Sequence, residues 1–441
     1  MKKLLALVLT CMMVLSFVAC TSTTDESAAQ SDTSSAQATT GDTEQAADAT
    51  SSEPITLKFW YWADTTEQSE LMQNIVAEYN ATNDMNVTVE AEENAWNGGA
   101  YVEDMYVAVA GGGGPDISTF RFSGASMYYN GGYLYNLTDM VDQWEDKDTI
   151  SDSIWSAISE STATDGEYYC MPWTYETLYV YYRPSIFEEV GIEVPTTYEE
   201  FMSAIEKCTL DTDGDGVTDI YGLALRGPGG QEPWYYFLNA NGATFDDLTS
   251  AEAIQGMEAY KSIYTNGWAP ETAPSDGYSE IMATFKSGKA AMVIHHIGSS
   301  VGMVETFGDD VAAFTLPASE SGNQWDALCD TDIVVLSSTQ YPEACFDFAK
   351  FMATGEGQEM WYEGTGKSNM NSKITAREDF QSNPFLQVCL EGMDHAGTFP
   401  FTPYVSEFIS TTWAQTTQQI LLGEVSVEEG MQIYQKALFG E

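Results

Sequence analysis

Basic residues are scarce in this sequence. The 441 residues include 16 Lys and Arg against 67 Asp and Glu, so the formal net charge is −51 at pH 7. A chain with this charge repels nucleic-acid phosphates and anionic lipid surfaces, which excludes nucleic acid as a partner. The acidic residues are spread along the chain, and we interpret them as a solvated surface.

Cysteine and histidine are also few. Beyond residue 20 there are five widely spaced cysteines, Cys170, Cys208, Cys329, Cys345 and Cys389. An odd, dispersed set is not a disulfide framework, so we expect buried free thiols. The histidines are His295, His296 and His395, and the sequence has no GxSxG, HExxH or P-loop motif. Because these catalytic signatures are missing, we predict that the chain is not an enzyme.

The N-terminal residues have the pattern of an export signal. Lys2 and Lys3 precede an apolar run over residues 4–19 that is short for a membrane span. The run ends at Ala19 and Cys20, which resembles the lipobox of bacterial lipoproteins, where the cysteine sulfur carries a diacylglycerol. We predict a signal peptide over residues 1–19 and lipidation of Cys20. A plain secreted protein is the alternative.

A spacer follows this cysteine. Residues 21–52 contain no aromatic residue, no Lys and no Arg, a composition that cannot bury enough apolar surface to become ordered. We therefore assign residues 20–53 to the lipidated cysteine and a disordered tether. A tether suits a cell with a thick wall, so the expected location is the extracytoplasmic face of a Gram-positive cell membrane.

The remaining chain alternates strand and helix patterns. Strands are predicted over residues 55–60, 87–90 and 115–117, and helices over residues 67–80 and 101–109. The alternation restarts with an apolar segment at 178–182 and a helix from Thr197, where Glu200 completes a capping box. This order predicts an α/β fold with largely parallel sheets.

Five segments then carry a family resemblance. They are GGGGPDISTF, GGYLYNLT, YYCMPWTYETLYVYYRPSIFEEVGIEVPTTYEEF, FKSGKAAMVI and ACFDFAKFMATGEGQEMW. In this order they resemble the extracellular solute-binding proteins of carbohydrate ABC transporters, the maltose-binding-protein group. The resemblance implies a two-lobed periplasmic-binding-protein-like fold with a hinge and an interlobe ligand cleft. It also implies a monomer that captures a sugar or oligosaccharide by lobe closure and delivers it to permease subunits.

The same resemblance sets the expected lobes. Residues 54–173 with 328–365 would form lobe 1, and residues 174–327 with 366–441 would form lobe 2. The chain would cross between them near residues 171–174, 325–331 and 364–367.

A sugar site needs aromatic platforms for the apolar face of the ring and carboxylates for its hydroxyls. By resemblance, Asp64 and Glu176 supply the carboxylates, with Asp64 alternatively a helix N-cap. The site residues that we predict are Trp62, Asp64, Phe120, Ser123, Trp173, Glu176, Trp234, His295, Trp325 and Trp361, and His296 is an alternative to His295.

The segment DTDGDGVTD has the spacing of a calcium-binding loop. Asp211, Asp213, Asp215, Val217 and Asp219 fill the ligand positions, but Gly222 stands where a bidentate glutamate is usual. The interpretations are a weak structural calcium site or a solvated acidic turn, and no other cofactor is expected.

Two other functions stay open. A secreted glycoside hydrolase would use Asp64 and Glu176 as acid and base. A surface lectin would use the same lobes without a transporter.

Overall fold

The computed structural model describes residues 53–96, 100–160, 162, 166–228 and 234–440, apart from the side chains of Phe122 and Ser123. The predicted signal peptide, Cys20 and most of the tether lie outside the described residues. Within the described part, no helix is both long enough and apolar enough to cross a membrane.

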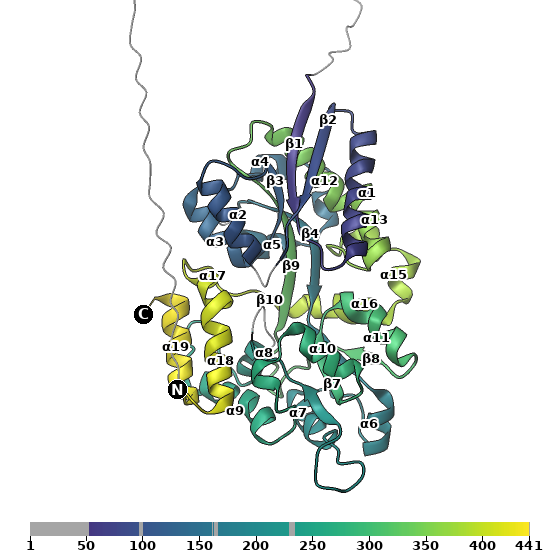
Figure 1. Ribbon diagram of the computed structural model, residues 1–441, viewed down its shortest axis with the longest axis vertical. Helices are drawn as coiled ribbons and strands as arrows, with labels where there is room; N and C mark the ends of the chain where they lie inside the picture. Colours follow the sequence, from purple (N-terminus) through teal and green to yellow (C-terminus); the bar gives the residue numbers. More distant parts are fainter. Residues whose placement is uncertain (1–52, 97–99, 161, 163–165, 229–233, 441) are drawn as a thin grey trace, which may run out of the picture. The chain divides into compact units, whose positions relative to one another are not determined.

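The first sheet has six strands. Its path is β10 (Ala396–Gly397), β9 (Asp326–Val335), β3 (Ile117–Phe120), β1 (Ile55–Tyr61) and β2 (Val87–Glu93), and β4 (Met171–Thr177) also pairs with β9. The helices that surround it are α1 (Thr66–Thr82), α2 (Ala100–Ala110), α3 (Phe122–Gly131), α4 (Thr138–Asp142), α5 (Asp152–Glu160), α12 (Pro342–Thr354) and α13 (Glu356–Thr365). Figure 1 shows α1 and α13 side by side next to β2.

The second sheet has four strands in the order β6 (Tyr221–Ala224), β7 (Ala290–His295), β5 (Tyr179–Tyr182) and β8 (Ala312–Phe314). One set of helices shares a core with one face of this sheet: α6 (Pro184–Val190), α7 (Tyr198–Lys207), α8 (Trp234–Ala240), α9 (Ala251–Thr265), α17 (Val405–Glu407), α18 (Trp413–Leu422) and α19 (Val427–Phe439). A second set packs on the other face: α10 (Tyr278–Lys286), α11 (Ser300–Phe307), α14 (Ser372–Thr375), α15 (Glu378–Ser382) and α16 (Pro384–Gly392). Strand β5 is buried on both faces of this second sheet. Val180 packs against the helices of the first set, and Tyr181 packs against those of the second set.

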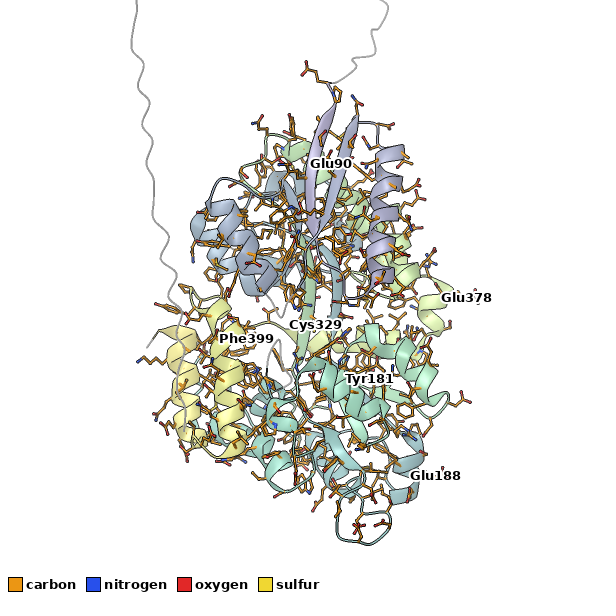
Figure 2. All side chains as sticks on the ribbon, in the orientation of Figure 1. Glu90, Tyr181, Glu188, Cys329, Glu378 and Phe399 are labelled. Atoms are coloured by element: carbon orange, nitrogen blue, oxygen red, sulfur yellow. The ribbon has the colours of Figure 1, made fainter. Side chains whose placement is uncertain are left out.

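Strands β4 and β9 connect the two sheets. They run antiparallel from Met171 opposite Ile333 to Thr177 opposite Leu328, and all seven residues of β4 are buried. Figure 1 shows the two strands side by side between the sheets, and Figure 2 labels Cys329 there on β9. A third segment joins them, because Tyr175 N donates to Ser368 O and Asn369 Nδ2 donates to Pro172 O. The lobe boundaries drawn from the sequence stay a prediction.

The predicted local structure is largely confirmed. Helix α1 covers the predicted segment, and Thr197 caps α7 by accepting from Glu200 N. The capping box is only half formed, because the Glu200 carboxylate accepts from Thr196. The five cysteines beyond residue 20 are free and buried, as expected.

The prediction of largely parallel sheets is confirmed only in part, because both sheets are mixed. In the first sheet β1 is parallel to β2 and β3, but β9 is antiparallel to both β3 and β4. In the second sheet β6 and β7 are parallel, whereas β5 is antiparallel to β7 and β8. In the first sheet the reason is that β9 runs against β3 and β4, although it is parallel to β10.

Candidate binding site

Glu176 lies near the end of β4, where the chain reaches the second sheet. Its side chain is 8% exposed, and two basic side chains face it. His296 Nδ1 lies 3.1 Å from Oε2, and Lys367 Nζ lies 3.5 Å from Oε1. Burial alone would raise the pKa of Glu176, but His296 and Lys367 outweigh it and hold the pKa well below its usual range. The carboxylate is therefore ionised and accepts hydrogen bonds.

The bond between Glu176 and His296 depends on the proton of the imidazole. Gly298 N also lies 3.0 Å from the same Nδ1 and donates to it. An unprotonated Nδ1 accepts from Gly298, whereas a protonated Nδ1 donates to Glu176. His296 is thus a partner of Glu176 in only some of its protonation and tautomeric states.

Lys367 also reaches Asp64, in the loop between β1 and α1. Its Nζ lies 3.7 Å from Asp64 Oδ2, and the Asp64 side chain is 55% exposed. The N-cap of α1 is Thr65, whose side chain accepts from Gln68 N. The alternative interpretation of Asp64 as the helix N-cap is therefore wrong by one residue. The carboxylates of Asp64 and Glu176 flank one ammonium group.

An aromatic stack adjoins this charged cluster. Tyr278 opens α10, and its ring centroid lies 4.1 Å from that of His295 and 5.3 Å from that of His296. Tyr278 is 38% exposed, and the guanidinium carbon of Arg226 lies 5.3 Å from its ring centre. His295 is buried, its Nδ1 is hydrogen-bonded to Ser299 Oγ, and burial lowers its pKa to about 3. His295 therefore supports the exposed Tyr278 ring as a neutral side chain.

A second aromatic group follows β1 and β2. The Trp62 ring is packed between Trp96, at 4.8 Å, and Tyr101, at 5.1 Å between centroids, and only 8% of Trp62 is exposed. Trp96 is half-buried, and the Arg121 guanidinium lies 5.2 Å from its ring centre. Trp96 thus offers more open surface than Trp62.

Several predicted ligand aromatics are core residues in this structure. Trp234 is fully buried and stacks on Trp413 at 4.6 Å, so its ring has no face for a sugar. Trp173 and Trp361 are 3% and 4% exposed and pack against each other at 4.6 Å. Phe120 is 1% exposed. Since each of these four rings lies within a hydrophobic core, we do not expect them to contact the ligand.

Two predicted residues remain to be placed. Trp325 is half-buried and makes an edge contact with Tyr235 at 4.9 Å, so part of its surface is open. The side chain of Ser123 lies outside the described residues.

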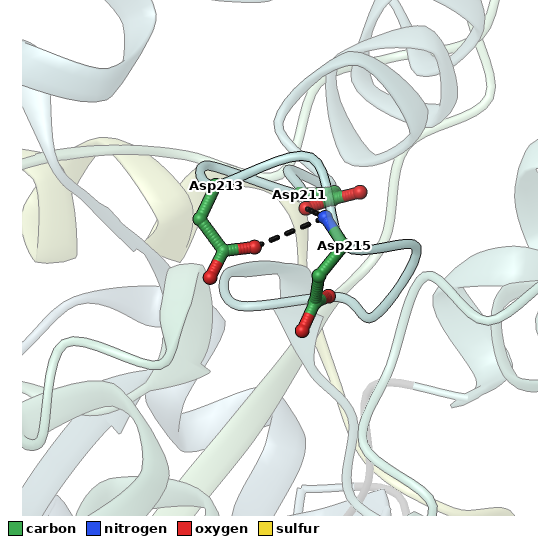
Figure 3. Close-up of side chains that lie close together, drawn as sticks. All are labelled: Asp211, Asp213 and Asp215. Carbon is green, nitrogen blue, oxygen red and sulfur yellow. Dashed lines mark hydrogen bonds between the residues drawn. The ribbon is translucent and has the colours of Figure 1, made fainter.

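The predicted calcium loop gathers three of its carboxylates. Asp211, Asp213 and Asp215 each place an oxygen within 4.8 Å of the others, and all three are exposed (Figure 3). Asp211 also accepts from Gly214 N and Gly216 N, which shapes the turn. The Asp219 carboxylate instead accepts from Thr212, so it is turned toward the loop backbone. The calcium site stays a prediction.

Comparison with known proteins identifies the family. The sequence pattern of the bacterial extracellular solute-binding proteins matches residues 74–388. The chain belongs to this family. Among its relatives, the maltotriose-binding protein of Pyrococcus abyssi is 23% identical over 351 residues, which cover 76% of this chain and 71% of the relative. The mannitol-binding protein of Pseudomonas aeruginosa is 22% identical over 366 residues, which cover 74% and 80%.

Solved structures share the fold of this solute-binding protein. The sugar-binding protein MalE from Xanthomonas citri has a TM-score of 0.74 at 16% identity, covering 87% of this chain and 96% of that one. A solute-binding protein of an ABC transporter from Thermotoga lettingae, bound with α-D-tagatose, has a TM-score of 0.73 at 18% identity, covering 87% and 98%. The two-lobed α/β fold predicted from the sequence is confirmed.

Three residues of this region were not predicted from the sequence: Lys367 and Arg121, whose charges act on Glu176, and Tyr278, which stacks on His295 and His296. Lys367 and Arg121 are two of only 16 basic residues in the chain, and their scarcity was the available signal. Tyr278 stands at a helix start after Gly277, and an aromatic residue there has no distinctive pattern.

Proposed function

We propose that this solute-binding protein captures a sugar or short oligosaccharide and delivers it to the permease subunits of an ABC importer. The observation that carries this proposal is the ionised Glu176, which is paired with His296 and Lys367, together with the exposed Tyr278 ring that stacks on His296. A carboxylate accepts from sugar hydroxyls, and an aromatic ring packs against the apolar face of a pyranose. The maltotriose-binding relative and the solved structure bound with α-D-tagatose also support a carbohydrate as the ligand.

The proposed capture works by closure around the hinge strands β4 and β9. Asp64 follows β1 of the first sheet, whereas His296 follows β7 of the second sheet and Tyr278 begins α10, which packs on that sheet. A ligand that contacts groups on both sides favours the closed arrangement, because only differential contact shifts such an equilibrium. Contacts with the permease would then favour opening and release.

We propose binding without catalysis. A glycoside hydrolase acid needs a raised pKa to hold its proton, whereas the pKa of Glu176 is lowered. Lys367 also lies between Glu176 and Asp64. This arrangement suits a fixed acceptor of hydrogen bonds.

The proposed location is the outer face of a Gram-positive cell membrane, where lipidated Cys20 would anchor a monomer through the tether. Mass spectrometry of the membrane fraction would test the anchor, since a diacylglycerol on Cys20 adds a defined mass. An unmodified, secreted chain would contradict it.

A thermal-shift screen of residues 54–441 against mono- and oligosaccharides and sugar alcohols tests the ligand class, because a ligand that binds only the folded state raises the melting temperature. A sugar hit that is recovered intact supports capture. Hydrolysis of the hit would favour the glycosidase, and no shift with any sugar would refute a carbohydrate ligand.

A further inference from the structure

Lys367 is a largely buried cation beside Glu176. It follows Gly366, which ends α13 with φ of 71°, and its own N–H donates to Thr365 Oγ1 at 3.1 Å. Its side chain is only 14% exposed, and its Nζ lies between the carboxylates of Glu176 and Asp64 at 3.5 and 3.7 Å. The backbone turn thus directs a long cation into a confined position.

A glycine provides the space for this side chain. A Cβ atom on Gly298 would lie 2.6 Å from Lys367 Cε and 2.8 Å from His296 Cε1. Contacts this short do not occur, so any larger residue at 298 would displace the lysine stem or the imidazole. Gly298 therefore lets Lys367 and His296 approach Glu176 together.

Apart from His296 and Arg121, the other titratable groups around Glu176 and Lys367 do not supply a positive charge. Burial raises the pKa values of Tyr179 and Tyr181 on β5, and it raises that of Cys389 on α16 to about 12. His295 on β7 is neutral, since burial lowers its pKa to about 3. Arg121 acts on Glu176 through its charge, but it is a weaker influence than His296 and Lys367. Because Gly298 N also donates to His296 Nδ1, the contact of His296 with Glu176 depends on the ring proton, whereas that of the Lys367 ammonium group does not.

We propose that Lys367 is a positioning residue that keeps the buried carboxylate of Glu176 ionised and therefore always an acceptor for ligand hydroxyls. Burial favours the neutral form of a carboxyl group, and a nearby positive charge reverses that preference. A protonated Glu176 would present an O–H donor and lose acceptor capacity. The role of Glu176 toward a sugar rests on the proposed function, whereas the control of its ionisation does not.

The first test needs no ligand. The Glu176 carboxyl carbon is followed by NMR through a pH titration of protein labelled with ¹³C-glutamate, and Glu176→Gln assigns its signal. Lys367→Met and Lys367→Gln remove the charge, and Lys367→Arg restores it. Lys373→Met is the matched control, because Lys373 pairs with Asp146 at 2.7 Å in a partly exposed ion pair.

We expect Glu176 to titrate above about pH 5.5 in Lys367→Met and Lys367→Gln, and below about pH 5 in the wild type, Lys367→Arg and Lys373→Met. The same titration in all folded variants would overturn the proposal.

The second test uses the sugar that the thermal-shift screen identifies. Between pH 8 and pH 5, Lys367→Met should lose at least threefold more affinity than the wild type, and Lys367→Arg should restore the wild-type profile. An equal loss at every pH would overturn the proposal, because it would indicate a contact that is independent of the ionisation of Glu176. If no sugar binds, the proposed function fails, and the NMR titration still decides the role of Lys367.

Discussion

Asp326 is expected to destabilise the folded protein at neutral pH. It begins β9, is fully buried, and neither carboxyl oxygen has a hydrogen-bond partner among the described residues. Burial raises its pKa well above the usual value, and the negative charge of Glu391 adds to this. In the folded protein this carboxyl group must therefore either keep its proton or be ionised while buried, and both cost free energy at neutral pH.

The magnitude follows from proton linkage. An unfolded aspartate has a pKa of about 3.9, and each pH unit between the unfolded and folded pKa costs about 1.4 kcal/mol. Since pH 7 lies about three units above the unfolded value, the cost at pH 7 is at most about 4 kcal/mol. Because the pKa of Asp326 is raised on folding, ionisation lowers the free energy of unfolding as the pH rises. This cost is absent below about pH 4 and grows as the pH rises toward the pKa of the folded state.

The change to make is Asp326→Asn, which keeps the shape and cannot ionise. We expect the free energy of unfolding to rise by about 2–4 kcal/mol at pH 7 and by little at pH 4. Urea unfolding of the wild type and the variant from pH 4 to 8 measures this, and Asp309→Asn, at an exposed position, is the control. A gain that does not change with pH, or no gain at pH 7, would refute the reasoning.

Three further predictions concern the corrected and proposed sites. Trp234→Ala should cost about 3–5 kcal/mol of stability, because it empties a core position, while the ligand affinity of the folded variant stays unchanged; a large loss of affinity would restore Trp234 to the site. Tyr278→Ala should weaken sugar affinity about 5- to 30-fold by titration, whereas Tyr341→Ala, equally exposed, should not. Calcium at millimolar concentration should raise stability by about 1 kcal/mol, and Asp213→Asn should abolish that rise; equal responses of both proteins would leave the loop a solvated turn.

Local patterns predicted the elements well because their signals lie within a few residues. The apolar spacing predicts the helix over 67–80, and Glu200 three residues after Thr197 predicts the helix start at Thr197. The direction of one strand relative to its neighbours could not be predicted from such local signals. The paired residues of β4 and β9 lie more than 150 positions apart, from Thr177 opposite Leu328 to Met171 opposite Ile333, so their antiparallel pairing depends on the path of the whole chain.

The aromatic residues show the limit of reasoning from residue type. Trp234 and Tyr278 are both aromatic residues at helix starts, yet the first is fully buried and the second is 38% exposed. Their difference comes from Trp413 and other rings that cover Trp234 from distant elements. Glu176 was found by resemblance, whereas its partner Lys367 follows from the packing around Gly298.

The most direct test of the central claim is a calorimetric titration of the wild type and Glu176→Gln with the sugar from the screen, followed by chromatography of the recovered ligand. We predict that the wild type binds the sugar and returns it unchanged, and that Glu176→Gln loses about 2 kcal/mol of binding free energy, or roughly 30-fold in affinity. Equal affinity in the two proteins, or consumption of the sugar, would contradict a binding site centred on Glu176.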